Sequence, residues 1–250
     1  MSSDFATVLV GLAVALGFTW LLSGPLKRRP AACYLIAAVA SAGYFAYRAA
    51  GLYVPWALPF IAAMQRGYCA VFLLAVVMFI GVLGDSSSLR RRLNPVRAEL
   101  SIASFIFILG HVWVYGSVYV PGIATVASSR GSVGVSFALA VVLFALFALL
   151  TVLSVRVIRK HMKLEVWKAI QRSAYVMVGL LFLHVLFVMG NSAIDSAHAR
   201  VSLICYGAIV LLYAVLRVRK AVLDAREKRA SSLSQVGEAM LFEEGELAIS

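Results

Sequence analysis

Seven long apolar segments constrain the fold of this chain more than any other feature. They cover residues 5–24, 32–50, 66–84, 98–119, 134–155, 173–190 and 200–217. A helix needs about 20 apolar residues to cross the hydrocarbon core of a bilayer. Only 14% of the residues are charged, whereas a soluble domain carries about 25%. The sequence therefore excludes a water-soluble globule and predicts an all-α, polytopic membrane helical bundle of about seven transmembrane helices.

The basic residues lie on one side of this predicted bundle. Of the 23 lysines and arginines, 19 follow the first, third, fifth or seventh segment, and the other four are Arg48, Arg66, Arg130 and Arg200. Positive charge collects in the cytoplasmic loops of membrane proteins. We therefore expect a multi-pass protein of the cytoplasmic membrane, with its N-terminus outside and its C-terminus in the cytoplasm. Membrane lipid is the expected surrounding partner, and the net charge of +12 needs no nucleic acid to explain it.

Two stretches lie outside the seven segments. Residues 52–64 contain two prolines and two aromatic residues besides Tyr53, which predicts an interfacial loop, either on the membrane surface or partly re-entrant. Residues 218–250 are polar, with acidic residues toward the end. We expect them to form a flexible cytoplasmic tail, because such a composition cannot bury a core.

Two histidines interrupt the apolar segments. An ionisable side chain in hydrocarbon costs free energy and usually marks function. His111 lies 14 residues after Arg97, and His184 lies 12 residues after Arg172. On helices that rise 1.5 Å per residue, both imidazoles are about 18–21 Å from the cytoplasmic edge, just beyond the midplane. At matched depth they could bind the two faces of one haem. The alternative is two unrelated core histidines, each hydrogen-bonded to a neighbour.

Four further residues bear on such a site. Gly110 and Gly179 lie near the two histidines on their helices, and glycine would let a porphyrin approach. Arg48 and Arg66 lie near the outer ends of their segments. They either pair with haem propionates or extend to the outer headgroups. The other two histidines lie in predicted loops, where we expect them to be solvated: His161 and His198.

The segments around the two histidines resemble the ferric-reductase-like transmembrane superfamily. RAELSIASFIFILGHVWVYG is similar to its haem helix, and WKAIQRSAYVMVGLLFLHVLF is similar to a later helix with the pattern W-x-x-x-H-x-x-x-Y and then a second His. The nearest likeness is the haem-binding membrane subunit of the periplasmic methionine sulfoxide reductase system. Trp167, Tyr175 and His184 match its pattern. Two residues depart from the pattern. Gln171 stands where that subunit has the first histidine of the pair, and Arg97 stands where larger ferric reductases have a fourth histidine.

The resemblance covers roughly residues 66–217 and implies a six-helix core. The expected organisation is an extra transmembrane helix with a basic loop at 1–31, a haem-binding domain at 32–217 and a cytoplasmic tail at 218–250. Because Gln171 and Arg97 replace two histidines of the family, we expect this chain to lack the cytoplasmic-side haem of larger relatives. What remains is one b-type haem, with His111 and His184 as the axial ligands of its iron.

The function implied by the resemblance is electron transfer. Electrons would pass from a membrane quinol or flavin donor through the haem to an extracytoplasmic redox protein. Some relatives bind FMN, but no flavin site can be identified in this sequence. A single haem beyond the midplane lies roughly 20 Å from the cytoplasmic surface, which argues against direct reduction from that side. The chain has no catalytic acid–base pair, so we expect an electron-transfer subunit of an oxidoreductase system rather than the substrate-reducing enzyme.

Two other functions stay open at this point. One is direct transmembrane reduction of ferric ions, and the other is a transporter or assembly factor in which the histidines are structural. Against a transporter, the segments lack broken helices with facing charges, an inverted repeat and, in our interpretation, carboxylates inside the membrane. A retinal protein is excluded because the segment 200–217 has no lysine to form a Schiff base.

Overall fold

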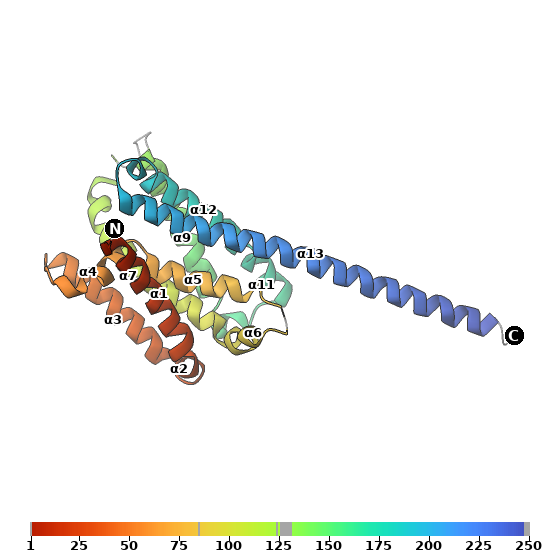
Figure 1. Cartoon of the computed structure of the whole chain (residues 1–250). Coiled ribbons are helices and arrows are strands. Elements are labelled where there is room, and N and C mark those ends of the chain that lie inside the picture. Colours follow the sequence, from red (N-terminus) through yellow and green to blue (C-terminus); the bar gives the residue numbers. More distant parts are fainter. Residues whose placement is uncertain (1, 85, 124, 126–131, 248–250) are drawn as a thin grey trace.

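The computed structural model describes residues 2–84, 86–123, 125 and 132–247 of the 250-residue chain. Every regular element in these ranges is helical. Figure 1 shows a bundle of helices from which the last helix extends far to one side. Six helices are long and apolar enough to cross a membrane, or up to seven if a bent pair counts as one span. The predicted all-α, polytopic bundle is thus confirmed, and the chain is built as an integral, multi-pass membrane protein.

The first half of the chain forms a group of helices around one core. Its elements are α1 (Ser2–Leu16), the π-helical turn η1 (Gly17–Leu21), α2 (Ser23–Arg28), α3 (Pro30–Ala49), η2 (Pro55–Ala57), α4 (Leu58–Gln65), α5 (Tyr68–Ile80) and α7 (Arg97–Tyr119). α1 packs against α4 and α5, while α3 and α5 pack against α7. The core of this group includes the fully buried side chains of Tyr44, Met64, Tyr68, Leu73 and Leu100.

Prolines begin helices in the stretch between α3 and α5. Pro55 stands in the first turn of η2, and Pro59 in the first turn of α4. Proline is tolerated there because the first N–H groups of a helix have no partner within it. Residues 55–64 are therefore helical where a loop was predicted, while the bent pair of helices that they form with α5 still allows the re-entrant course. The exposure of Tyr53 (75%) and Trp56 (86%) is what aromatic side chains at a membrane interface would show.

A second group of helices completes the bundle. The remaining elements are α6 (Ser88–Leu93), η3 (Asn94–Val96), η4 (Val120–Gly122), α9 (Ser132–Val152), α10 (Arg156–Arg159), α11 (Leu164–Gln171), α12 (Ser173–Met189), η5 (Asn191–Ala193) and α13 (Ala197–Leu247). α12 packs against α9 and α13, and α9 also contacts α7. α9 therefore links the two helices that carry the predicted haem ligands.

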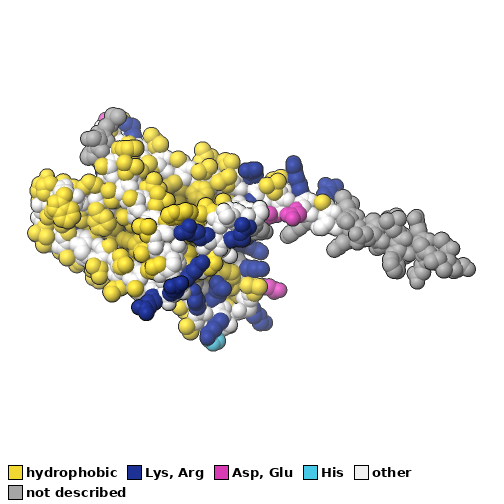
Figure 2. Space-filling model, turned by 60° about the horizontal axis from the view of Figure 1, so that its bottom comes forward, with side chains coloured by type: hydrophobic (Ala, Val, Ile, Leu, Met, Phe, Trp, Pro, Cys, Tyr) yellow, Lys and Arg dark blue, Asp and Glu magenta, His cyan; other side chains and the backbone are white. Residues whose placement is uncertain are grey.

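Lysine and arginine side chains gather toward one end of the bundle, and apolar side chains cover most of the rest of the face in Figure 2. We call it the basic end, and its residues include Lys27, Arg28, Arg29, Arg90, Arg91, Arg92, Arg156, Arg159 and Lys160. Arg92 lies over the ring of Trp20, 4.1 Å from the ring centre. This polarity agrees with the expected orientation, which stays a prediction. Arg130 lies outside the described residues.

The last helix continues well past the predicted end of the membrane domain. α13 runs for 51 residues without interruption from Ala197, a length of about 77 Å. Lys220 and Asp224 form an ion pair of 3.1 Å between successive turns, which supports a helix beyond residue 217. The boundary at 217–218 is therefore not a break in secondary structure. The flexibility of residues 218–250 stays a prediction.

Candidate functional site

His111 is anchored on the backbone of a different helix. It lies on α7, 14 residues beyond Arg97, which is the first residue of that helix. Its side chain is partly buried. Its Nδ1 lies 2.7 Å from the carbonyl oxygen of Gln65, the last residue of α4. A carbonyl oxygen only accepts, so Nδ1 carries the proton and donates it. The ring's lone pair is therefore on Nε2, where it can bind a metal.

His184 is anchored in the same way. It lies on α12 and is partly buried. Its Nδ1 donates to the carbonyl oxygen of Ser136, near the start of α9, at 3.0 Å. The Ser136 hydroxyl oxygen lies 3.2 Å from the same Nδ1. The same reasoning leaves the lone pair of His184 on Nε2.

The structure brings the two histidines into one region of the bundle. α9 packs against both α7 and α12 and carries the carbonyl that accepts from His184. A series of aromatic rings also leads from His111 to α9, the helix whose carbonyl holds His184. The ring of Tyr115 lies 4.7 Å from that of His111, Tyr119 follows at 6.3 Å, and Phe137 lies 6.5 Å from Tyr119. Phe137 is the neighbour of Ser136, so this series leads from one histidine to the helix that holds the other.

This donor set fits the iron of a haem. A histidine that binds a metal usually donates its second ring N–H to a carbonyl or carboxylate, which fixes the tautomer and the ring orientation. His111 and His184 both do so. Among the described residues there is no group of three or more His, Cys, Asp or Glu side chains that could hold a bare metal ion. Two neutral imidazoles are a chemically suitable pair of protein ligands for a haem iron.

The two glycines have different surroundings. A Cβ on Gly110 would lie 3.2 Å from backbone and side-chain atoms of Ser41 on α3. Gly110 therefore allows α3 to pack closely against α7, rather than making room for a porphyrin. A Cβ on Gly179 would have no atom within 4 Å. The approach of a cofactor at Gly179 is sterically open and stays a prediction.

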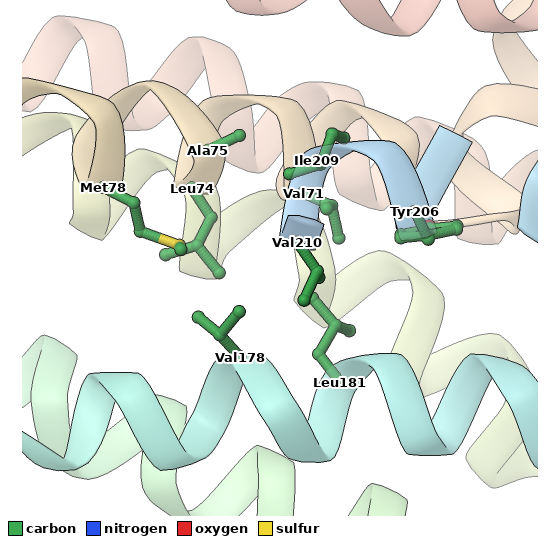
Figure 3. Close-up of a pocket in the computed structure, with 9 residues that line it drawn as sticks. All are labelled: Val71, Leu74, Ala75, Met78, Val178, Leu181, Tyr206, Ile209 and Val210. Carbon is green, nitrogen blue, oxygen red and sulfur yellow. The ribbon is translucent and has the colours of Figure 1, made fainter. Parts of the chain in front are cut away.

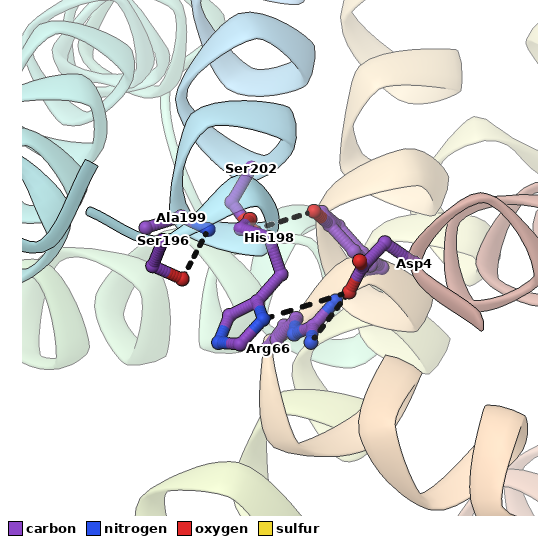
Figure 4. Close-up of polar contacts among 7 residues, drawn as sticks. Asp4, Arg66, Ser196, His198, Ala199 and Ser202 are labelled. Atoms are coloured by element: carbon purple, nitrogen blue, oxygen red, sulfur yellow. Dashed lines mark hydrogen bonds and ion pairs between the residues drawn. The ribbon is translucent and has the colours of Figure 1, made fainter. Parts of the chain in front are cut away.

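The two candidate arginines also differ. Arg48 is exposed. The Nη2 of Arg66 lies 3.3 Å from Oδ1 of Asp4, while its Nη1 is buried without a hydrogen-bond partner among the described residues. Figure 4 shows Arg66 and His198 both reaching Asp4, with the His198 Nδ1 at 3.8 Å from the same oxygen. The His198 side chain is 59% exposed and His161 is exposed, as predicted, although His198 lies in the first turn of α13 and not in a loop.

Sequence reasoning missed the residues that anchor the imidazoles. Gln65 and Ser136 act through backbone carbonyls, which every residue has, so no residue type could signal them. It also missed two buried carboxylates, Asp4 and Glu99. Asp4 lies one residue before the first predicted segment, so it was not counted among the polar residues inside the membrane.

Glu99 corrects our interpretation that the apolar segments lack carboxylates. It lies within the predicted segment 98–119 and is 3% exposed. Its Oε1 accepts hydrogen bonds from Nε and Nη2 of Arg156, at 3.0 and 2.6 Å. The pair lies at the basic end, near the start of α7. It compensates a buried charge and joins α7 to the segment after α9.

The half of the bundle toward the basic end is filled by apolar side chains. One buried cluster there consists of Leu74, Met78, Phe147, Leu150, Met177, Val178 and Tyr213. Gln171, at the end of α11, has a buried Nε2 without a hydrogen-bond partner among the described residues. Arg97 donates from Nε to the carbonyl of Val77 at 3.0 Å. The two positions that differ from the family pattern thus supply no imidazole, and side chains occupy the core beside them.

An apolar crevice with a cavity volume of only about 10 Å³ lies between α5, α12 and α13, as Figure 3 shows. Its lining includes Leu74, Met78, Val178, Leu181, Tyr206 and Val210. Pockets for small ligands usually measure about 300–1,000 Å³. Neither His111 nor His184 lines the crevice, so it is separate from the histidine site.

Comparisons with known proteins match part of this chain. A protein of Treponema pallidum (strain Nichols), named "Uncharacterized protein", is 34% identical over 171 residues, which are 66% of this chain and 46% of that relative. This chain thus spans less than half the length of the relative. No solved structure gives a significant match. Residues 66–182, which contain His111 and end two residues before His184, match the family described as "Ferric reductase like transmembrane component".

Proposed function

We propose that this protein is a membrane b-type cytochrome that passes electrons through one haem held by His111 and His184. The donor is a membrane quinol or a flavin, and the acceptor is an extracytoplasmic oxidoreductase partner that reduces the substrate. The match to a ferric reductase like transmembrane component supports membrane electron transfer as the general function. The haem, its ligands, the donor and the acceptor are the finer parts of the proposal.

One observation carries the proposal. Two imidazoles on different membrane-spanning helices each donate Nδ1–H to a backbone carbonyl, which leaves both Nε2 atoms ready to bind iron. A structural histidine in a core can make the same single hydrogen bond, but here both imidazoles make it through Nδ1 to a carbonyl, as metal-binding histidines usually do. Bound haem would supply reversible one-electron chemistry at iron.

The surrounding residues have supporting roles. Gln65 and Ser136 hold the two ring orientations through their carbonyls. Arg66 is the better candidate for a haem propionate, because its Nη1 is buried and lacks a partner among the described residues. Arg48 is exposed, which fits contact with headgroups instead.

The position of the histidines favours a donor within the membrane. His111 lies 14 residues from the start of α7 at the basic end, or about 21 Å along the helix. The buried apolar cluster fills the core in between. A hydrophobic quinol can approach the haem from the bilayer, whereas a cytoplasmic protein would have to transfer electrons across this distance.

The first test is a reduced-minus-oxidised visible spectrum of the purified protein, with haem quantified as its pyridine haemochrome. We expect the sharp α-band of a six-coordinate b-type haem, at about one haem per chain. A colourless protein from cells supplied with haem would overturn the proposal and leave the transporter or assembly class. Two haems per chain would overturn the single-haem part.

The donor and acceptor need a separate test. In liposomes, a short-chain quinol should reduce the haem, and ferric chelates added outside should not reoxidise it rapidly. Rapid reoxidation by ferric chelates alone would favour the direct ferric reductase. Failure of quinols together with reduction by added FMN and a flavin reductant would replace quinol with flavin as the donor.

A further inference from the structure

The bend between α4 and α5 leaves two carbonyl groups free to bind other helices. The two helices meet at 52°, and Gly67 between them has φ +72°, a conformation that favours glycine. The last carbonyls of a helix have no partner within it. Here the Gln65 carbonyl accepts from His111, and the Arg66 carbonyl accepts from the hydroxyl of Tyr206. We call Gln65, Arg66 and Gly67 the elbow.

The elbow is held from three helices besides its own. α7 contributes His111, and α13 contributes Tyr206, whose side chain is almost fully buried. α1 contributes Asp4, which pairs with the Arg66 side chain at 3.3 Å. The side chains of Asp4 and Arg66 are only 11% and 18% exposed, so water screens the pair less than it would at the surface.

We propose that Asp4 and Tyr206 are positioning residues, which act through the elbow to orient the His111 imidazole as an axial ligand. This inference rests on the proposed function. Asp4 fixes the Arg66 side chain and Tyr206 fixes its carbonyl, so together they restrain the peptide that follows Gln65. The hydrogen bond to the Gln65 carbonyl sets the orientation of the His111 ring. A shift of the elbow would therefore rotate this ring and change how its Nε2 meets the iron.

The inference assigns a role to α1, which lies outside the segment 66–182 that matches the family. α1 is then more than an added membrane anchor, because its Asp4 completes the support of a ligand on α7. Partners of metal-binding histidines typically change metal affinity by roughly 10- to 100-fold when removed. Asp4 and Tyr206 act one step further away, so we expect effects near the lower end.

The test uses the full-length protein with bound haem and the variants Asp4→Asn and Tyr206→Phe. Tyr213→Phe is the matched control, because it removes a buried phenol from the same helix two turns away without touching the elbow. Two properties are measured: the rate of haem transfer to apomyoglobin, and the largest g-value in the EPR spectrum of the ferric low-spin haem. That g-value responds to the orientation of the axial imidazoles, which a general loss of stability would not change.

We expect Asp4→Asn and Tyr206→Phe to bind haem, to lose it roughly tenfold faster and to shift the g-value, with Tyr213→Phe unchanged. Unchanged haem loss and g-value in both elbow variants would overturn the inference, and so would equal changes in Tyr213→Phe. If one variant fails to fold, the other decides. A wild-type protein without haem would instead overturn the proposed function, so the two failures are distinguishable.

Discussion

The two helices that carry the proposed ligands are embedded very differently. α7 buries eight of its 23 residues and packs against α3 and α5, whereas α12 buries three of its 17 and packs mainly against α9 and α13. Side-chain hydrogen bonds also hold α7 from both sides. Ser41 donates to the Ile106 carbonyl at 2.8 Å, and Ser104 donates to the Ala70 carbonyl at 2.7 Å.

The difference suggests two roles within one site. α7 is a fixed part of the scaffold, because close packing and hydrogen bonds across helices determine its position without a ligand. α12 has a more exposed surface, and His184 itself provides its hydrogen bond to α9. We therefore expect changes on α7 to alter stability more than equivalent changes on α12, while both histidines matter equally for the cofactor.

The largest expected effect is the loss of cofactor on removal of either ligand. His111→Ala and His184→Ala should each reduce bound haem at least tenfold, since loss of a group that only hydrogen-bonds to a metal-binding histidine already costs roughly 10- to 100-fold in metal affinity. Haem per chain is measured by pyridine haemochrome after purification. His161→Ala, in an exposed position, is the control and should keep its haem. A wild-type spectrum in either ligand variant contradicts the assignment.

Gly110→Ala and Gly179→Ala compare the packing of the two helices directly. The new Cβ on Gly110 would lie 3.2 Å from Ser41, and such overpacking typically costs about 1–3 kcal/mol. Gly179→Ala meets no atom within 4 Å and should stabilise the protein by about 0.4–1 kcal/mol, because alanine loses less conformational entropy in a helix than glycine. Unfolding in detergent and denaturant measures both. Equal effects would remove the contrast between α7 and α12.

Ser41→Ala and Ser136→Ala make a finer comparison. Ser41→Ala removes the donor to the Ile106 carbonyl and should destabilise the protein by about 1 kcal/mol. Ser136→Ala keeps the carbonyl that accepts from His184, so haem transfer to apomyoglobin should stay within about twofold of wild type, well below the tenfold change typical when a ligand's partner is lost. Rapid haem loss from Ser136→Ala would show that the hydroxyl, rather than the carbonyl, orients His184.

The smallest expected effect concerns the half of the bundle toward the basic end. The double variant Arg97→His with Gln171→His restores both histidines of the family pattern. We expect it still to bind one haem per chain, because the buried cluster around Phe147 and Met177 fills the core there. Haem is again quantified per chain. A second haem would mean that this core can rearrange around a cofactor.

Much of the architecture could be predicted from the sequence, because a bilayer leaves few options. Every backbone polar group must be satisfied within hydrocarbon, so a long apolar segment becomes a helix. The segment 173–190, for example, became α12, Ser173–Met189. The stretch 52–64 could not be predicted, because its prolines mark a loop or a helix start equally well. In the folded protein most of this stretch forms α4, which packs against α1 and α7.

The sequence by itself determined the class of protein, most of its membrane spans, the basic end and the two histidines that stand in apolar surroundings. These follow from composition and spacing, which are local properties of the chain. Only the tertiary structure decided how the imidazoles are oriented and what Gly110, Arg66 and Glu99 contact. Those contacts join residues far apart in sequence, such as Asp4 with Arg66 and Glu99 with Arg156. The anchors of both histidines are backbone carbonyls, whose positions depend on helix packing and not on residue type.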